Sequence, residues 1–286
     1  MSVKERIPRR IIQVWGTLSR KNPISPGEKS ANLPLFGKAS AANLRLLNPD
    51  FEYLLFDDDE IEQFVDQEYP QYRSVLDSFS RRIQRYDFFR YLAVYHLGGF
   101  YFDTDVFLAT GLETLLEHGC VFPFEHLSIQ RFLYDKYGMD WEIGNYGFGA
   151  APGHPFLKAI INNVVRAQQH PEWAEIMWRS IPRIFRSEYI VLDTTGPGLV
   201  SRTLAEYPAA REQVRVLFPD DVCDSNNWYR FGDYGIHLQI SSWRKREPLV
   251  RRVLHRHWVA STRRALSKES LKRGGKRSLE FRSSPA

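Results

Sequence analysis

The sequence predicts an α/β fold, with a mostly parallel central sheet and helical additions in one domain. Apolar segments of strand length alternate with segments of helical spacing, which is typical of a parallel sheet covered by helices. The chain has 286 residues, 43% of them hydrophobic and 14% aromatic, which is enough to bury one large core. We find no internal repeat that would indicate a solenoid or an array.

The N-terminal part supplies the first two strands and a connecting helix. An apolar run at 10–16 predicts a strand that ends in a turn, and the Ser-, Pro- and Gly-rich stretch 17–37 predicts a loop. Residues 39–47 have helical spacing, and 51–56 read as the next strand. Asn48-Pro49 stops the first helix, because proline disfavours helical geometry in the residue before it.

The next segment predicts two helices and a third strand. Asp57, Asp58 and Asp59 offer N-cap carboxylates to a helix that runs towards Tyr69. Residues 81–97 have apolar side chains at spacings of three and four, and Gly98-Gly99 ends that helix. The aromatic run after the glycines predicts a strand.

The second half of the chain is less regular. We expect a helical region over 155–186 and short strands at 190–192 and 214–218, and the segment 234–243 carries His237 and ends in Ser241-Ser242-Trp243. Val250, Leu254 and Trp258 are spaced as one stripe of a basic amphipathic helix. Beyond Gly274-Gly275 the composition turns polar and predicts disorder. We therefore expect residues 1–245 to form the domain and 246–286 a basic helix with a flexible tail.

Charge is distributed unevenly along the chain. Residues 244–286 hold 14 Lys and Arg against three Glu, so this segment carries +11 and the preceding chain −6, within a net charge of +5. Nucleic-acid-binding domains spread basic charge over a folded face, so this profile argues against that class of protein. A basic end on an acidic body favours contact with an anionic membrane or an acidic lipid-linked substrate.

The sequence predicts a cytoplasmic protein, and its basic end adds the inner face of the membrane as a further expectation. The first eight residues lack the apolar core of a secretion signal, and no apolar run is long enough to span a bilayer. Cys120 and Cys223 lie in dissimilar contexts without metal-ligand spacing, so we expect two reduced, partly buried thiols.

The strongest chemical signal is the acidic pair Asp103 and Asp105 at the end of the aromatic run 97–102. Alternation along a strand places the two carboxylates on one side, where like charges repel unless a cation lies between them. Mn²⁺ or Mg²⁺ takes oxygen ligands and bridges to phosphate oxygens. The pair therefore predicts a metal site for a nucleotide-linked substrate.

These residues resemble glycosyltransferase family 32, which carries the DxD sugar-binding region. The family includes yeast initiating α-1,6-mannosyltransferases, bacterial capsular polysaccharide transferases and, distantly, the glucosyltransferase domains of clostridial toxins. The similarity runs through residues 7–245 as an ordered series of motifs. The series is Ile7 to Trp15, Asn48-Pro49 with Leu55 to Asp58, Asp87 to Tyr91 with Gly98 to Val106, Asn145 to Pro155, Thr195 to Pro197, and His237 with Ser242-Trp243. Ile12 departs from the pattern, because many relatives have His there.

The resemblance implies a GT-A fold, dependence on Mn²⁺ or Mg²⁺, a UDP- or GDP-sugar donor and retention of anomeric configuration. It implies that a hexose moves to a glycan or lipid-linked glycan acceptor in surface polysaccharide or glycolipid synthesis. Asp105 and Asp103 would hold the metal, with His237 as the third protein ligand. Asp103 would alternatively contact the ribose or the sugar of the donor.

The resemblance also implies roles for residues around the donor. Asp87 and Arg90 share a helix face and would bind sugar hydroxyls and phosphate oxygens, since the planar Arg fork suits pairs of oxygens. Trp15 would stack on the nucleobase. The remaining donor-binding candidates are Thr104, Asn145, Thr195, Ser242 and Trp243, the last two on a loop that would close over the diphosphate and exclude water.

Each candidate also has a purely structural interpretation. Asp87 and Arg90 can form an ordinary ion pair, Trp15 and Trp243 can be core anchors, and His237 can be a satisfied core histidine.

Two other functions fit parts of the pattern. In a haloacid-dehalogenase-like phosphohydrolase, Asp103 would be the nucleophile and Asp105 the general acid/base, with Asp220-Asp221 as a late acidic pair. A non-catalytic nucleotide-sugar-binding protein is the third possibility. The motif's position behind two strand–helix units and the intact acidic pair favour the transferase.

Overall fold

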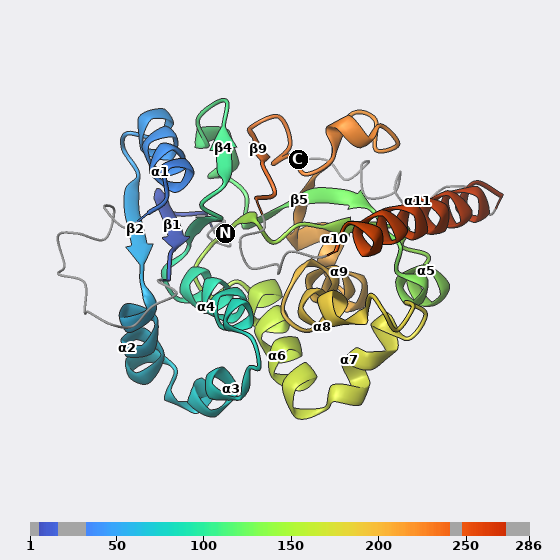
Figure 1. The fold of residues 1–286 in the computed structure, drawn as a ribbon. Helices are drawn as coiled ribbons and strands as arrows, with labels where there is room; N and C mark the ends of the chain where they lie inside the picture. Colours follow the sequence, from blue (N-terminus) through green and yellow to red (C-terminus); the bar gives the residue numbers. More distant parts are fainter. Residues whose placement is uncertain (1–5, 17–32, 241–247, 273–286) are drawn as a thin grey trace.

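The computed structural model describes residues 6–16, 33–240 and 248–272 (Figure 1). A seven-stranded sheet has the strand order β2-β1-β3-β7-β5-β6, and β8 also pairs with β5. Its strands are β1 (Arg10–Val14), β2 (Glu52–Phe56), β3 (Gly99–Phe102), β5 (Cys120–Leu127), β6 (Trp141–Ile143), β7 (Gly147–Ala150) and β8 (Arg215–Leu217). A separate two-stranded sheet joins β4 (Val106–Leu108) to β9 (Gly235–His237).

Five of the seven strands in the main sheet run in the same direction. β1 is parallel to β2 and β3, and β5 is parallel to β8. β7 is antiparallel to both β3 and β5, and β6 is antiparallel to β5. The predicted α/β architecture with a mostly parallel sheet is therefore confirmed.

Except at the edge strand β2, which is exposed or half-buried, most strand residues are buried, and alternation along the strands separates two cores. On β1, Ile12 and Val14 join the larger apolar cluster, whereas Ile11 joins the smaller one. On β3, Tyr101 points to the larger cluster while Phe100 and Phe102 point to the smaller. A polar side chain inside these strands must therefore find partners within the protein, because neither face is open to water.

Helices cover the sheet and extend below it in Figure 1. They are α1 (Leu35–Leu47), α2 (Asp58–Glu68), α3 (Arg73–Ser78), α4 (Arg82–Leu97), α5 (Arg131–Tyr137), α6 (Pro155–Gln169), α7 (Pro171–Trp178), α8 (Arg186–Thr194), α9 (Pro197–Glu206), α10 (Ala210–Gln213) and α11 (Leu249–Lys272). Short 3₁₀ turns occur at η2 (Pro70–Tyr72), η3 (Glu113–Leu115) and η4 (Ser225–Asn227).

The predicted start of α2 and the predicted end of α4 are confirmed. Asp57 caps α2 by accepting the Glu60 N–H at 3.0 Å, and the Glu60 side chain accepts the Asp57 N–H in return. Gly98 ends α4 with φ at 66°, and a Cβ at this position would lie 2.8 Å from Pro8 and Pro152. The chain can therefore turn from α4 directly into β3, which carries the acidic pair at its end.

The structure also corrects several expectations. Residues 190–192 lie inside α8 and do not form a strand. The expected helical region 155–186 contains two separate helices, α6 and α7, and a third helix, α8, begins only at its last residue. Pro171 begins α7, where the N–H that proline lacks would have no partner within the helix. The first helix begins at Leu35, within the stretch expected to be a loop. The rest of that loop and the expected disordered tail lie outside the described residues.

Helix α11 packs on the body of the protein through one side. Trp258 lies against Phe185 and Tyr189, and Leu266 is buried. Val250 and Leu254, which the sequence places on the same stripe as Trp258, are exposed. Within the described parts of the chain, no helix has the length and apolar character needed to cross a membrane. Cys120 is a buried free thiol and Cys223 an exposed one.

Candidate metal and sugar-nucleotide site

The acidic pair lies on a tight turn between β3 and β4, just past the end of β3. The turn is closed by the Val106 N–H, which donates to the Asp103 carbonyl at 3.1 Å. Asp103 Oδ1 accepts the Tyr101 hydroxyl at 2.6 Å, while Asp105 Oδ2 accepts the Ile240 N–H at 2.8 Å. A strand was expected to align the two carboxylates, but a turn held by these contacts aligns them instead.

His237 completes a cluster of three possible ligands. The β4–β9 register pairs Val106 with His237, which brings the imidazole beside Asp105. Its Nε2 lies 3.3 Å from Asp105 Oδ1, and one ligand atom from each of Asp103, Asp105 and His237 lies within 4.8 Å of the others. The ring stacks on Tyr146 with 4.4 Å between centroids, which fixes its orientation.

Arg90 joins the acidic pair to the buried carboxylate of Asp87. Its Nη1 lies 3.2 Å from Asp103 Oδ1, and its Nη2 lies 2.8 Å from Asp87 Oδ1. Nη1 also donates to the Asn145 carbonyl at 2.9 Å, and the guanidinium lies over the Tyr101 ring. With a side chain only 4% exposed, Arg90 compensates the buried carboxylate of Asp87 and the half-buried carboxylate of Asp103.

Buried polar side chains hold Asp87 from the other side. Thr195 donates its hydroxyl to Asp87 Oδ2 at 2.8 Å. The Asn145 amide nitrogen lies 3.4 Å from Asp87 Oδ1 and donates to the Tyr91 hydroxyl at 2.9 Å. Tyr91 in turn donates to the Thr195 carbonyl at 2.7 Å. The sequence named Asp87, Asn145 and Thr195 as neighbours of the donor, and the structure brings all three together.

The protonation equilibria of the carboxylates differ because their surroundings differ. Burial raises the pKa of Asp87 to about 6, against the opposing effect of Arg90. Burial also raises the pKa of Asp103, again opposed by Arg90. Burial acts in the same direction on Asp105, but the His237 imidazole and the Ile240 N–H outweigh it and lower the pKa of Asp105. Asp105 is therefore the most readily ionised of the three.

Gln13 supports the acidic turn through its side-chain amide and was not predicted from the sequence. It is fully buried on β1, and its amide nitrogen donates to the Asp103 carbonyl at 3.1 Å and towards Ser40 Oγ at 3.3 Å. Tyr53 donates its hydroxyl to the Gln13 amide oxygen at 2.7 Å, and Ser40 donates to the Val106 carbonyl at 2.7 Å. An amide within an otherwise apolar strand was the available signal.

The chain after β9 adopts an unusual backbone conformation next to the site. Gln239 has φ at 55°, a left-handed conformation that non-glycine residues seldom adopt. This conformation follows Leu238, whose N–H donates to the Asp105 carbonyl at 3.0 Å, and precedes Ile240, whose N–H reaches the Asp105 carboxylate. Backbone strain of this kind persists where surrounding contacts impose it, which is common at functional sites.

The donor set fits a hard divalent cation. Two carboxylates and one imidazole are ligands that Mn²⁺ accepts, and Mg²⁺ prefers the oxygens. Ligands about 2.1 Å from one ion lie about 3.0 Å apart when adjacent and about 4.2 Å apart when opposite. The 3.3 Å between Asp105 and His237 is close to the first value. All three ligand atoms lie within 4.8 Å of one another, which is only slightly more than the separation expected for ligands on opposite sides of one ion.

The other predicted residues have different outcomes. Trp15 is half-buried just past β1, with its ring edge-on to Phe36, and Thr104 is half-buried on the acidic turn. Ser242 and Trp243 lie outside the described residues. Ile12, the departure from the family pattern, is fully buried in the core and contributes no polar group to the site.

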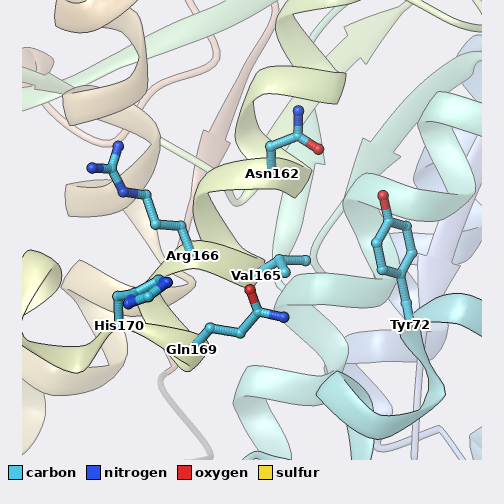
Figure 2. A pocket seen from close by; sticks show the side chains of 6 residues that line it. All are labelled: Tyr72, Asn162, Val165, Arg166, Gln169 and His170. Carbon is cyan, nitrogen blue, oxygen red and sulfur yellow. The ribbon is translucent and has the colours of Figure 1, made fainter.

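A separate hollow of about 370 Å³ is lined by residues of η2, of α6 and of the junction between α6 and α7 (Figure 2). Its lining residues are Tyr72, Asn162, Val165, Arg166, Gln169 and His170. None of them is a predicted site residue. In Figure 1, α6 lies at the opposite end of the molecule from β4 and β9.

Comparison with known proteins shows that this chain is similar to glycosyltransferases. Residues 38–122 match the family described as "Glycosyltransferase sugar-binding region containing DXD motif". The chain is 27% identical over 258 residues to inositol phosphoceramide mannosyltransferase 2 of Schizosaccharomyces pombe, covering 88% of this chain and 62% of that protein. It is 26% identical to mannosyl phosphorylinositol ceramide synthase CSH1 of Saccharomyces cerevisiae, covering 74% of this chain and 49% of that protein.

The chain thus spans about half to two thirds of the length of these two relatives. Among solved structures, it is similar to one titled PaToxG Glycosyltransferase, with a TM-score of 0.47, 17% identity, and coverage of 73% of this chain and 72% of that one. The resemblance drawn from the motifs is confirmed: residues 38–122, which hold Asp87, Arg90, Asp103 and Asp105, match the model of the glycosyltransferase sugar-binding region containing the DXD motif, and the chain is similar to fungal mannosyltransferases.

Proposed function

We propose that this protein is a metal-dependent, retaining glycosyltransferase of GT-A type that moves a hexose from a nucleotide-sugar donor to a glycan or glycolipid acceptor. Mannose is the first sugar to test, because the fungal relatives are named mannosyltransferases and mannosyl synthases. GDP-mannose is therefore the first donor, with UDP-glucose and UDP-galactose beside it. The same names make an inositol-phosphate-containing lipid the first acceptor class to test.

The observation that carries the proposal is the joining of two clusters by one arginine. The ligand cluster Asp103, Asp105 and His237 is suited to a diphosphate-bound cation. Asp87 accepts hydrogen bonds from hydroxyl and amide groups, and the guanidinium of Arg90 connects it to Asp103. A nucleotide sugar presents a diphosphate and a hydroxyl-rich ring next to each other, so this pair of sites matches its two halves.

Asp103, Asp105 and His237 would hold Mn²⁺ or Mg²⁺, which when bound stabilises negative charge on the departing diphosphate. Arg90 holds Asp103 and Asp87 in fixed positions and supplies a permanent positive charge near the phosphates. Asp87 orients the sugar by accepting hydrogen bonds from its hydroxyls. Trp15 offers its ring to the nucleobase, a stacking contact worth about 1–3 kcal/mol.

Retention requires the acceptor to arrive on the face that the diphosphate leaves. Under this proposal the acceptor hydroxyl attacks the anomeric carbon from that side as the sugar–phosphate bond breaks. The departing diphosphate takes the hydroxyl proton, so no enzyme base is needed, and direct attack from the leaving-group side needs no enzyme nucleophile. The buried side chains around Asp87 keep the sugar in place and limit attack by water, which would waste the donor.

The test is release of nucleoside diphosphate from each donor, with and without Mn²⁺. We expect turnover of at least one donor, and losses of 100-fold or more for Asp105→Asn and for Asp87→Asn. Asp221→Asn is the matched control, because Asp221 is an exposed acid on the loop after β8. The anomeric configuration of the product, read by NMR, tests retention separately. No turnover of any donor, together with no binding of nucleoside diphosphate, would overturn the proposal.

The same samples test the alternatives. A haloacid-dehalogenase-like phosphohydrolase would cleave phosphomonoesters and would lose activity with Asp221→Asn. Asp103 follows the third strand in chain order, behind two strand–helix units, which argues against the phosphohydrolase. Binding of a nucleoside diphosphate without turnover of any sugar would favour a non-catalytic binding protein. The named relatives give neither alternative support.

A further inference from the structure

The first turns of α11 carry an unpartnered apolar surface. We define the α11 tip as Leu249, Val250, Val253 and Leu254, whose side chains are 53–70% exposed. At 3.6 residues per turn these four positions fall on one side of the helix. Isolated exposed apolar residues are ordinary, but four within six residues form a patch that implies a partner.

The opposite side of α11 fixes the helix to the protein. Trp258 and Leu266 pack into the body, and Arg263 donates its Nε–H to the Leu127 carbonyl at 2.8 Å. Ser270 donates to Asp140 at 2.6 Å near the other end. Because α11 is docked along most of its length, the α11 tip is presented rigidly, and the helix cannot rotate to bury it.

Exposed cations continue along the same side of the helix. Arg256, Arg264, Lys268 and Lys272 are exposed and lie at or beside the angular position of the α11 tip. In all, α11 contains seven Lys and Arg against one acid, Glu269. Glu269 pairs with Arg131 at 2.7 Å, so it does little to reduce the basic character of the exposed side.

We infer that α11 docks on an anionic lipid surface, with the α11 tip inserted among the headgroups and the following cations on the lipid phosphates. An apolar end beside a row of basic residues matches the two layers of a membrane interface, which accepts apolar side chains and attracts cations. A nucleic acid would use the cations but leave the α11 tip in water, so the lipid surface accounts for more of the observed side chains.

The docked surface is linked to the candidate site by a short piece of chain. Ile240, which caps Asp105, is nine residues before Leu249, so the two lie at most roughly 30 Å apart. Under the proposed transfer to a lipid-borne acceptor, docking would hold the metal site near the headgroups. This consequence rests on the proposed function, whereas the lipid binding itself does not.

The experiment is sedimentation of the full chain with vesicles, without any donor. We expect binding to vesicles of phosphatidylcholine with 30% phosphatidylglycerol, and at least tenfold weaker binding to phosphatidylcholine alone. Val253→Ser/Leu254→Ser should weaken binding at least tenfold, and Arg256→Gln/Arg264→Gln should remove most of the preference for anionic lipid. Leu35→Ser/Leu46→Ser is the matched control, because both leucines are highly exposed on α1.

Equal binding to both vesicle types, no binding to anionic vesicles, or an equal loss in the α1 control would overturn the inference. So would a dimer in analytical ultracentrifugation that dissociates with Val253→Ser/Leu254→Ser, since the occupant of the α11 tip would then be a second copy. Donor hydrolysis in the absence of lipid should be the same for the wild-type chain and these variants. Failure of the lipid inference and failure of the proposed transferase activity are therefore separate results.

Discussion

Replacing Arg90 with Met should destabilise the protein far more than any single surface ion pair could. The side chain is 4% exposed and lies between Asp87 at 2.8 Å and Asp103 at 3.2 Å. Removing one partner from a buried ion pair typically costs about 3–5 kcal/mol, because the remaining charge is left without compensation. We therefore expect the free energy of unfolding to fall by about 3–5 kcal/mol, or roughly 10 °C in melting temperature.

The loss should depend on pH in a defined direction. Without the guanidinium, the pKa of Asp87 rises further above its unfolded value, so the folded variant holds a proton that the unfolded chain releases. Between the unfolded and the folded pKa of Asp87, the free energy of unfolding of the variant falls as pH rises. The loss of stability relative to wild type is therefore complete only above the folded pKa. Lowering the pH from 7 to 5 should therefore reduce the deficit.

The assay is urea unfolding followed by tryptophan fluorescence, at pH 7 and at pH 5. Arg90→Met/Asp87→Asn should recover part of the loss, because it removes one of the two uncompensated charges. Arg73→Met is the control, since Arg73 pairs with acids at the surface, where an ion pair is worth at most about 1 kcal/mol. A loss below about 1 kcal/mol for Arg90→Met, or no recovery in the double variant, would refute the reasoning.

Three further predictions concern neighbouring residues. Because burial raises the pKa of Asp87 to about 6, kcat/KM for the donor should fall as pH drops through 6, when the protonated carboxyl stops accepting two hydrogen bonds; a flat profile between pH 5 and 7 would contradict this. Gln13→Met should weaken Mn²⁺-dependent nucleotide binding at least fivefold, because the amide no longer holds the Asp103 carbonyl. It should also lower the free energy of unfolding by about 1–3 kcal/mol, since the Tyr53 hydroxyl loses its buried acceptor. Unchanged affinity in calorimetry would show that Gln13 does not position the acidic turn. Gln239→Gly should keep or raise the melting temperature, while Gln239→Val should lower stability by about 1–2 kcal/mol; equal melting temperatures would show that the left-handed backbone carries no strain.

The sequence predicted those parts of the site that depend on short spacings. Asp87 and Arg90 are three apart on one helix, and Asp103 and Asp105 are two apart, so each pair could be placed together without knowing the fold. Joining the two pairs and adding His237 relied on the family resemblance. The β4–β9 register that brings His237 to Asp105 spans about 130 residues, and a single sequence contains no signal for such a pairing.

Two kinds of error have physical causes. Residues 190–192 are Ile-Val-Leu, and so short an apolar run is compatible with a strand or with a helix. In the structure these residues are helical because they continue the turns of α8 on either side. β7 reads Gly-Phe-Gly-Ala, which lacks the β-branched pattern of a strand and was missed. Its glycines are needed because a Cβ at Gly149 would lie 2.5 Å from the Phe100 ring on the neighbouring strand.

The most direct test of the account is a titration of Mn²⁺ into the protein with GDP or UDP, followed by the loss of the free-ion signal in electron paramagnetic resonance. We expect one bound Mn²⁺ per chain in the presence of nucleotide. We expect Asp103→Asn/Asp105→Asn to lose this binding while its circular dichroism spectrum is unchanged. Undiminished Mn²⁺ binding by that variant would show that the acidic pair does not hold the metal.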